Sequence, residues 1–179
     1  MSRTVINSQK PILNTKLFSV DALEVEFGKM HDTFYGITVK PAVNILPLGD
    51  DNSITMIRNY RHFHDESFIE LVSGMIENDE SPLSAGKREL REEAGLIAAS
   101  WNNIGKFDLA SGIMKWPLYY YVAKQLTEKK QKLDDSEDID IVTMPFETAV
   151  EKIYSGKIVK QSTITGILLV DSMLRRRKL

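Results

Sequence analysis

The sequence predicts an α+β fold, an α/β/α sandwich with a small strand-rich appendage at its N-terminus. Segments rich in β-branched and aromatic residues outnumber helical segments, and the two kinds are interleaved without an internal repeat. The chain has 179 residues, which suits one compact domain with a sizeable core. Residues 1–40 hold strand patterns and no helix, so we expect them to form the appendage and residues 41–179 the main domain.

The expected elements follow from local composition. β-forming residues cluster over 16–45, with breaks near 28–32 and at Pro41. Further strands are expected over 54–61, 68–74, 116–126 and 139–146, with mixed strand and loop over 101–112. A turn is expected over 48–53, polar loops over 62–67 and 127–138, and helices over 147–156 and 162–179.

The helix expected between Ser81 and Gly95 has the clearest boundaries. Ser81 suits an N-cap, and Pro82 suits the first helical position, where its missing N–H is no loss. Gly95 is placed to end the helix in a left-handed turn. Three apolar residues share one face of this helix: Leu83, Leu90 and Ala94.

Composition excludes several classes of protein. A net charge of −2 gives no overall field that would attract nucleic acid or an anionic membrane, and the basic residues 175–178 are expected to be a solvated helix end. The absence of cysteine excludes a disulfide scaffold and a thiolate zinc site. No signal peptide is visible and the apolar run 166–170 is too short for a membrane span, so we expect a cytoplasmic protein.

Three carboxylates crowd one part of the central helix. Glu89, Glu92 and Glu93 have i, i+3 and i+4 spacings, so their side chains are expected to project together, away from the apolar face. Such like charges repel, and a hard cation such as Mg²⁺, which prefers carboxylate oxygens, would offset the repulsion. The alternative is a solvated charged helix in which Arg88 and Arg91 compensate part of the charge.

The flanking residues favour the metal site. Glu70 precedes a glycine turn that leads into the helix, and Glu80, eight residues before Arg88, could pair with that arginine. From Gly74 to Leu96 the chain reads one glycine, five residues, a glutamate, seven residues and then RELREEAGL. At every fixed position this stretch resembles the Nudix box, GX5EX7REUXEEXGU, in which U is a bulky aliphatic residue.

The resemblance implies a Nudix-type sandwich with a mixed sheet and an enzyme that hydrolyses a nucleoside diphosphate linked to another moiety. It implies Mg²⁺, or possible use of Mn²⁺, as cofactor, with Glu89, Glu92 and Glu93 as the metal ligands. Glu92 and Glu93 would thereby act in catalysis. The Ser73 backbone would contribute to the same metal site.

Residues 57–77 resemble the equivalent segment of ADP-ribose and nucleoside-diphosphate-sugar pyrophosphatases. This likeness implies that Glu70 helps to bind substrate or metal. It also implies that Arg58 or Arg61 clamps the substrate's diphosphate, for which the planar guanidinium donors are suited. Arg58 could instead be an ordinary surface residue of its strand.

The C-terminal part resembles the same subfamily, in which a glutamate of an acidic loop acts as general base or extra metal ligand. The matching residue is Glu137, with Asp135 as the alternative. The loop could also be only a solvated charged segment. The N-terminal strands resemble an appendage that two subunits exchange, so we expect a homodimer in which Phe34 or Tyr35 could stack on the base.

One departure from the subfamily concerns the substrate. Where ADP-ribose enzymes often carry a proline about sixteen residues past the box, this chain has Gly112, and the next proline is Pro117. ADP-ribose is therefore one candidate substrate, and GDP-mannose or another nucleoside diphosphate sugar is a second. The alternatives are a hydrolase of another nucleotide, such as a dinucleoside polyphosphate, and a Nudix module that binds a nucleotide sugar without cutting it.

Overall fold

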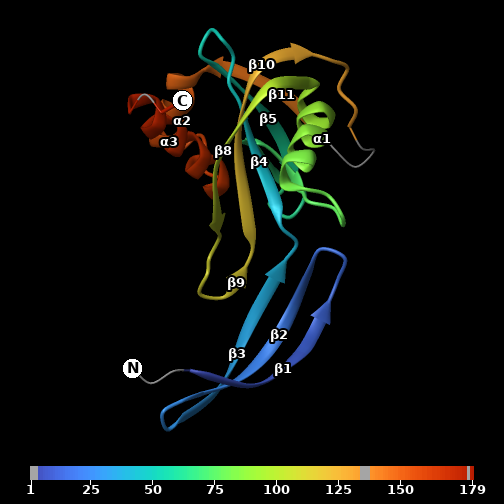
Figure 1. Ribbon diagram of the computed structural model, residues 1–179, viewed down its shortest axis with the longest axis vertical. Helices are drawn as coiled ribbons and strands as arrows, with labels where there is room; N and C mark the ends of the chain where they lie inside the picture. The colour runs from blue at the N-terminus through green and yellow to red at the C-terminus, as the bar shows by residue number, and fades with distance from the viewer. Residues whose placement is uncertain (1–3, 134–137, 177) are drawn as a thin grey trace. The chain divides into compact units, whose positions relative to one another are not determined.

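The computed structural model describes residues 4–133, 138–176 and 178–179, and these residues form eleven strands and three helices (Figure 1). The chain divides into two compact units. One unit comprises Met1–Pro41 and Phe107–Leu118, and the other comprises Ala42–Lys106 and Tyr119–Leu179. Each unit has its own sheet structure and is described separately below.

The first unit is a sheet of four strands in the order β1-β2-β3-β9. The first three strands are antiparallel, and β9 pairs with β3 in parallel. Gly28, at a φ of 63°, lies in the two-residue turn between β2 and β3, where a left-handed backbone suits glycine. The strands are β1 (Val5–Asn14), β2 (Phe18–Phe27), β3 (Met30–Val39) and β9 (Met114–Lys115).

Strand β1 was not predicted, because strands were expected only from residue 16 onward. Buried and exposed side chains do not alternate along β1, and nine of its ten residues are exposed. Its register with β2 shifts between Ile6 and Ser8 and again between Pro11 and Leu13. The strand therefore depends on backbone pairing with β2 rather than on a buried face, and such a strand leaves little signal in the sequence.

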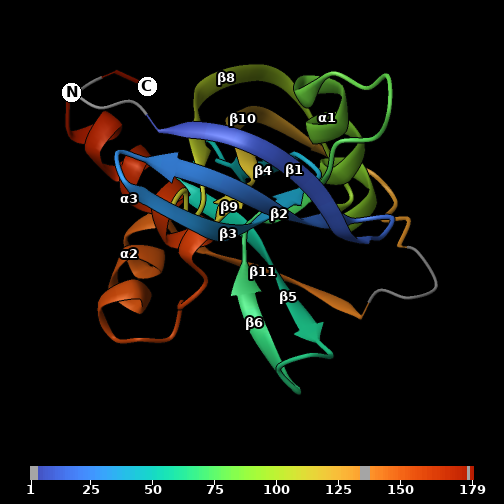
Figure 2. The same ribbon diagram turned by 90° about the horizontal axis from the view of Figure 1, so that it is seen from below.

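The second unit has helices on both faces of its strands, with α1 on one side and α2 and α3 on the other (Figure 1). One sheet has the order β7-β4-β10-β8, and the other has the order β11-β5-β6. Figure 2 shows β5 between β6 and β11. The elements are β4 (Ala42–Pro47), β5 (Ser53–Arg61), β6 (Glu66–Glu70), β7 (Val72–Met75), α1 (Pro82–Ala94), β8 (Leu96–Asp108), β10 (Pro117–Glu128), β11 (Ile139–Pro145), α2 (Phe146–Tyr154) and α3 (Gln161–Arg175).

The expected layered α+β arrangement is confirmed, and several boundaries differ. Residues 101–112 were expected to mix strand and loop, but β8 continues without interruption to Asp108. As an edge strand, β8 tolerates the exposed polar side chains that concealed it in the sequence. Phe146 begins α2 rather than ending β11, and its side chain is buried in the core.

The boundaries predicted for α1 are confirmed. Ser81 caps the helix, since its hydroxyl accepts a hydrogen bond from the Ser84 N–H at 3.1 Å. Pro82 occupies the first turn. Gly95, at a φ of 61°, ends the helix in the left-handed conformation, and its N–H donates to the Arg91 carbonyl at 3.2 Å.

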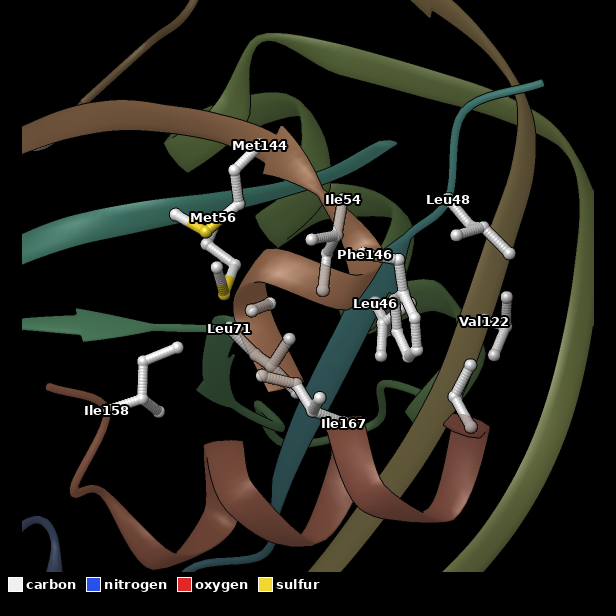
Figure 3. Close-up of a cluster of buried hydrophobic side chains, with 12 residues drawn as sticks. Leu46, Leu48, Ile54, Met56, Leu71, Val122, Met144, Phe146, Ile158 and Ile167 are labelled. Atoms are coloured by element: carbon white, nitrogen blue, oxygen red, sulfur yellow. The ribbon is translucent and has the colours of Figure 1, made fainter. Parts of the chain in front are cut away.

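The first turn of helix α3 is hydrogen-bonded to the residue between β6 and β7 and to strand β10. The Leu71 N–H donates to Thr163 Oγ1 at 3.1 Å, and the Tyr120 hydroxyl donates to the Ser162 carbonyl at 3.1 Å. Leu71 and Ile167 belong to one buried cluster with residues of β4, β5 and β10 (Figure 3). Among the described residues, no helix has the length and apolar character needed to cross a membrane.

Replacing Thr163 by Val should lower the free energy of unfolding by about 1–3 kcal/mol, because it leaves the buried Leu71 N–H without its acceptor. Thermal and urea denaturation would measure the loss. Thr165→Val on the same helix is the matched control. Equal stability of the two variants would show that the Leu71–Thr163 bond contributes nothing.

Candidate functional site

The glutamates of α1 face β7, and a glycine of β7 makes their approach possible. A Cβ atom at position 74 would lie 1.8 Å from Glu89 Oε1, so only glycine leaves room for this carboxylate. Glu89 is 8% exposed. Gly74, the first residue of the motif, therefore determines where the Glu89 carboxylate lies.

Glu93 lies one turn further along the same face and is held by the neighbouring residue of β7. The Ser73 N–H donates to Glu93 Oε2 at 2.9 Å, and Glu93 is 4% exposed. A buried carboxylate needs such a donor, because burying it unpaired is costly. The structure thus brings Ser73 and Glu93, two of the predicted metal-site residues, into direct contact.

Arg88 connects the remaining acids of the motif. It donates to Glu80 from Nε at 3.1 Å and from Nη2 at 3.0 Å, so the Arg88–Glu80 ion pair suggested by their spacing is present. Its Nη1 also donates to Glu89 Oε1 at 2.6 Å and to Glu92 Oε2 at 3.2 Å. The bond to Glu80, more than any other contact, raises the pKa of Arg88, and the same bond lowers the pKa of Glu80.

Of the three predicted ligands, Glu92 is the most open, with 34% of its side chain exposed. The three carboxylates, which were expected to project together away from the apolar face, therefore differ in their exposure. Glu89 and Glu93 are turned toward β7, and Glu92 lies toward Arg88. Hydrogen bonds from β7 and Arg88 offset the repulsion among them.

Glu70, at the end of β6, lies in a cluster of its own with two cations. Arg61 Nε donates to Glu70 Oε1 at 2.9 Å, and Arg61 Nη2 donates to Oε2. Lys160, just before α3, also donates to Oε2. Burial raises the pKa of Glu70, but the bonds and charges of Arg61 and Lys160 outweigh it, so the pKa lies below its usual value.

The two predicted arginines lie on opposite faces of β5. Side chains alternate along a strand, and Arg58 and Arg61 are separated by an odd number of positions. Arg61 shares the face of Ile57 and its cross-strand neighbour Glu70, whereas Arg58 is exposed on the other face. Arg61 therefore lies with Glu70, and Arg58 is separated from Arg61 by the sheet.

The chain that leaves β10 closes the C-terminal end of α1. The Lys129 N–H donates to the Gly95 carbonyl at 2.7 Å, and the Lys132 N–H donates to the Glu92 carbonyl at 3.1 Å. The Gln131 side-chain amide donates to the Glu93 carbonyl at 2.6 Å. Glu137 and Asp135, the two candidates for the general base, lie outside the described residues.

A divalent cation fits the donors present here. In the part of the chain that the structure describes, Glu89, Glu92 and Glu93 present carboxylate oxygens from one helix. All their donor atoms are hard oxygens, which Mg²⁺ prefers. Among the described residues, no three acids are already grouped around one point as ligands. Arg88, which donates to Glu89 and Glu92, would have to yield part of these contacts to a bound ion.

Sequence reasoning missed Lys160 and Gln131. Lys160 belongs to a segment between two helices that carried no motif, and Gln131 lies within a run of polar residues. Their roles depend on contacts with Glu70 and Glu93, which are 90 and 38 positions away in the chain. No local pattern could have indicated either contact.

Comparison with known proteins identifies the family of the chain. The NUDIX domain profile matches residues 38–162. The ADP-ribose pyrophosphatase of Mycobacterium tuberculosis is 31% identical over 135 residues, which are 74% of this chain and 65% of that protein. The methanol dehydrogenase activator of Bacillus methanolicus is 27% identical over 128 residues, 70% of this chain and 69% of that protein.

A solved structure supports the fold. The crystal structure of an ADP compounds hydrolase matches with a TM-score of 0.89 and 22% identity, covering 100% of this chain and 98% of that one. At this identity the likeness concerns the fold alone. Because the profile match covers the strands around the site and the whole glutamate-bearing helix, the chain belongs to the NUDIX domain family and is a Nudix hydrolase.

Proposed function

We propose that this Nudix hydrolase is a metal-dependent pyrophosphatase that cleaves the diphosphate of a nucleoside diphosphate sugar. The products are a nucleoside monophosphate and a sugar phosphate. The observation that carries the proposal is the pair of buried carboxylates, Glu89 and Glu93, that Gly74 and the Ser73 N–H hold against β7. A solvated charged helix would not bury its acids in this way.

A divalent cation held by Glu89, Glu92 and Glu93 would neutralise charge on the diphosphate and activate a water molecule. The protein supplies the remaining functions. Arg61 presents guanidinium donors near the site, as a diphosphate clamp requires, while Arg58 on the other face of β5 is the weaker candidate. Glu137, or alternatively Asp135, takes the proton of the attacking water as the water oxygen bonds to phosphorus and the P–O–P bond breaks.

ADP-ribose is the first candidate substrate, because the mycobacterial relative is named as an ADP-ribose pyrophosphatase. GDP-mannose is the second, because Gly112 stands where many ADP-ribose enzymes carry a proline. A dinucleoside polyphosphate hydrolase and a binding module without turnover are the other outcomes that an assay must separate.

The function is tested with purified protein, excess Mg²⁺ and a panel of ADP-ribose, ADP-glucose, GDP-mannose, UDP-glucose, diadenosine polyphosphates and nucleoside triphosphates. Phosphate released after phosphatase digestion of the products reports turnover. We expect turnover of ADP-ribose or another nucleoside diphosphate sugar. Binding without turnover of any compound would contradict the enzyme and support the binding module.

Glu93→Gln should lower the metal-dependent rate by about a hundredfold or more, since a bound ion contributes several kcal/mol to the transition state. Glu151→Gln, an exposed position of α2, is the matched control and should leave the rate unchanged. A rate for Glu93→Gln within about threefold of the parent would remove Glu93 from the site.

Gly74→Ala should lower kcat/KM by on the order of a hundredfold, because the added methyl group would displace the Glu89 carboxylate by about 1 Å or more. Circular dichroism should show an intact fold. Gly86→Ala on α1 is the control, since its Cβ would meet other atoms at 3.4 Å or beyond. Unchanged kcat/KM in Gly74→Ala would mean that the position of Glu89 is unimportant.

We also propose that the first unit mediates a homodimer. Its sheet has large apolar side chains that are exposed, and cross-strand pairing places Phe27 opposite Met30 and Phe34 opposite Leu23. The exposed fractions are 59% for Ile6, 48% for Phe27, 46% for Met30 and 51% for Phe34. A soluble monomer rarely leaves such a patch uncovered, so a second copy is the expected partner.

Phe34→Asp should convert a dimeric parent to monomers, because it places a charge in the apolar patch. Light scattering coupled to gel filtration measures the mass. Phe63→Asp, at a residue 98% exposed in the turn between β5 and β6, is the control and should remain dimeric. A monomeric parent would contradict the dimer outright.

A further inference from the structure

Two cations, Arg61 and Lys160, donate to one buried carboxylate, that of Glu70. Arg61 alone engages both oxygens of Glu70, from Nε to Oε1 and from Nη2 to Oε2. This bidentate contact already pairs the carboxylate. Lys160 nevertheless donates to Oε2 as a second cation.

The side chains of the two cations are partly exposed to solvent, whereas the carboxylate between them is buried. Glu70 has 1% of its side chain exposed, whereas Lys160 has 30% and Arg61 has 39%. Among the described residues, the hydrogen bond of the Lys160 ammonium goes to Glu70, and an ammonium has three donors. The carboxylate thus forms the base of the cluster, and the Lys160 side chain stays partly accessible to solvent.

Three observations connect Lys160 with the carboxylates of α1. Glu70 is three residues before Ser73, whose N–H holds Glu93. The first turn of α3, which follows Lys160, is fastened to Leu71 through Thr163. Burial lowers the pKa of Lys160, the positive charge of Arg61 acts in the same direction, and the negative charges of Glu70 and Glu93 act against that lowering.

We propose that Lys160 is a substrate-binding residue, held by Glu70 so that its ammonium contacts a phosphate of the nucleoside diphosphate. A partly buried cation bonded to Glu70, three residues before the Ser73 N–H that holds Glu93, suits a diphosphate, which bears negative charge on both phosphorus centres. The proposal rests on the proposed function, because it requires an anionic substrate at this site. It also gives Glu70 a role as the positioning residue of Lys160.

The competing explanation is that Lys160 only balances the charge of Glu70 and fastens α3. Under that explanation its loss lowers stability and leaves ligand affinity unchanged. The bidentate contact from Arg61 argues against it, because Glu70 remains paired without Lys160. Measurements of affinity and of stability on the same variants separate the two explanations.

The first test is isothermal titration calorimetry in EDTA, with the nucleoside diphosphate sugar that the parent hydrolyses. Without metal the ligand is not cleaved, so the experiment reports binding alone. Lys160→Met should weaken Kd by about tenfold or more, as expected for loss of a charged hydrogen bond, and Lys160→Arg should restore most of the affinity. Lys157→Met, at an exposed lysine three positions earlier, should leave Kd unchanged.

A lower melting temperature of Lys160→Met with Kd within twofold of the parent would overturn the proposal and support a purely structural lysine. A second measurement needs no mutation. The parent is treated with an acetylating reagent in EDTA, and mass spectrometry follows each lysine. Ligand should slow modification of Lys160 and leave Lys157 unaffected, and equal rates at Lys160 with and without ligand would also overturn the proposal.

The outcomes for Lys160 and for the proposed function are distinguishable. If the parent hydrolyses no compound of the panel, the proposed function fails before any variant is made. If the parent hydrolyses a nucleoside diphosphate sugar and Lys160→Met binds it as tightly as the parent, only the role of Lys160 fails.

Discussion

The docking of α1 on β7 through two buried carboxylates is the interaction on which the site depends. Acids are costly to bury, and here the cost is met by the Ser73 N–H at Glu93 and by Arg88 at Glu89. The missing side chain at Gly74 is equally necessary, because any Cβ would occupy the place of the Glu89 carboxylate. A short strand and one turn of helix thus hold two acids at fixed positions before any ligand arrives.

A second connection joins the opposite helical layer to the same region. The first turn of α3 is bound to Leu71 and Tyr120, and the residue before it reaches Glu70. Leu71 lies between Glu70 and the residues of β7, so the core contacts of α3 and the charges of the site share one stretch of chain. Leu71 also packs with Ile167 of α3 in the apolar core of this layer (Figure 3).

The sequence was most informative where structure depends on local chemistry. The ends of α1 could be predicted because Ser81, Pro82 and Gly95 act on their own neighbours. The pairing of Arg88 with Glu80 followed from a fixed spacing along one loop and one helix. Strand β1 and Lys160 could not be predicted, since each depends on a partner distant in sequence: the ladder of β2 for one and Glu70 for the other. The burial of Glu89 could not be predicted for the same reason, because the carboxylate is buried by its packing against Gly74 of β7.

Two structural constraints act on Gly95, its left-handed backbone conformation and its close contact with residues 129–131. Together they restrict which residues position 95 can accept. A left-handed helix end alone would admit asparagine as well as glycine. At position 95, however, a Cβ atom would lie 2.8 Å from the Lys129 carbonyl oxygen and 3.1 Å from the Gln131 nitrogen. The chain leaving β10 packs so closely over the helix end that even residues tolerant of the backbone conformation are excluded. A substitution at residue 95 is therefore possible only if the backbone of residues 129–131 moves. A homologue with a residue other than glycine at this position should have a different backbone conformation in that segment.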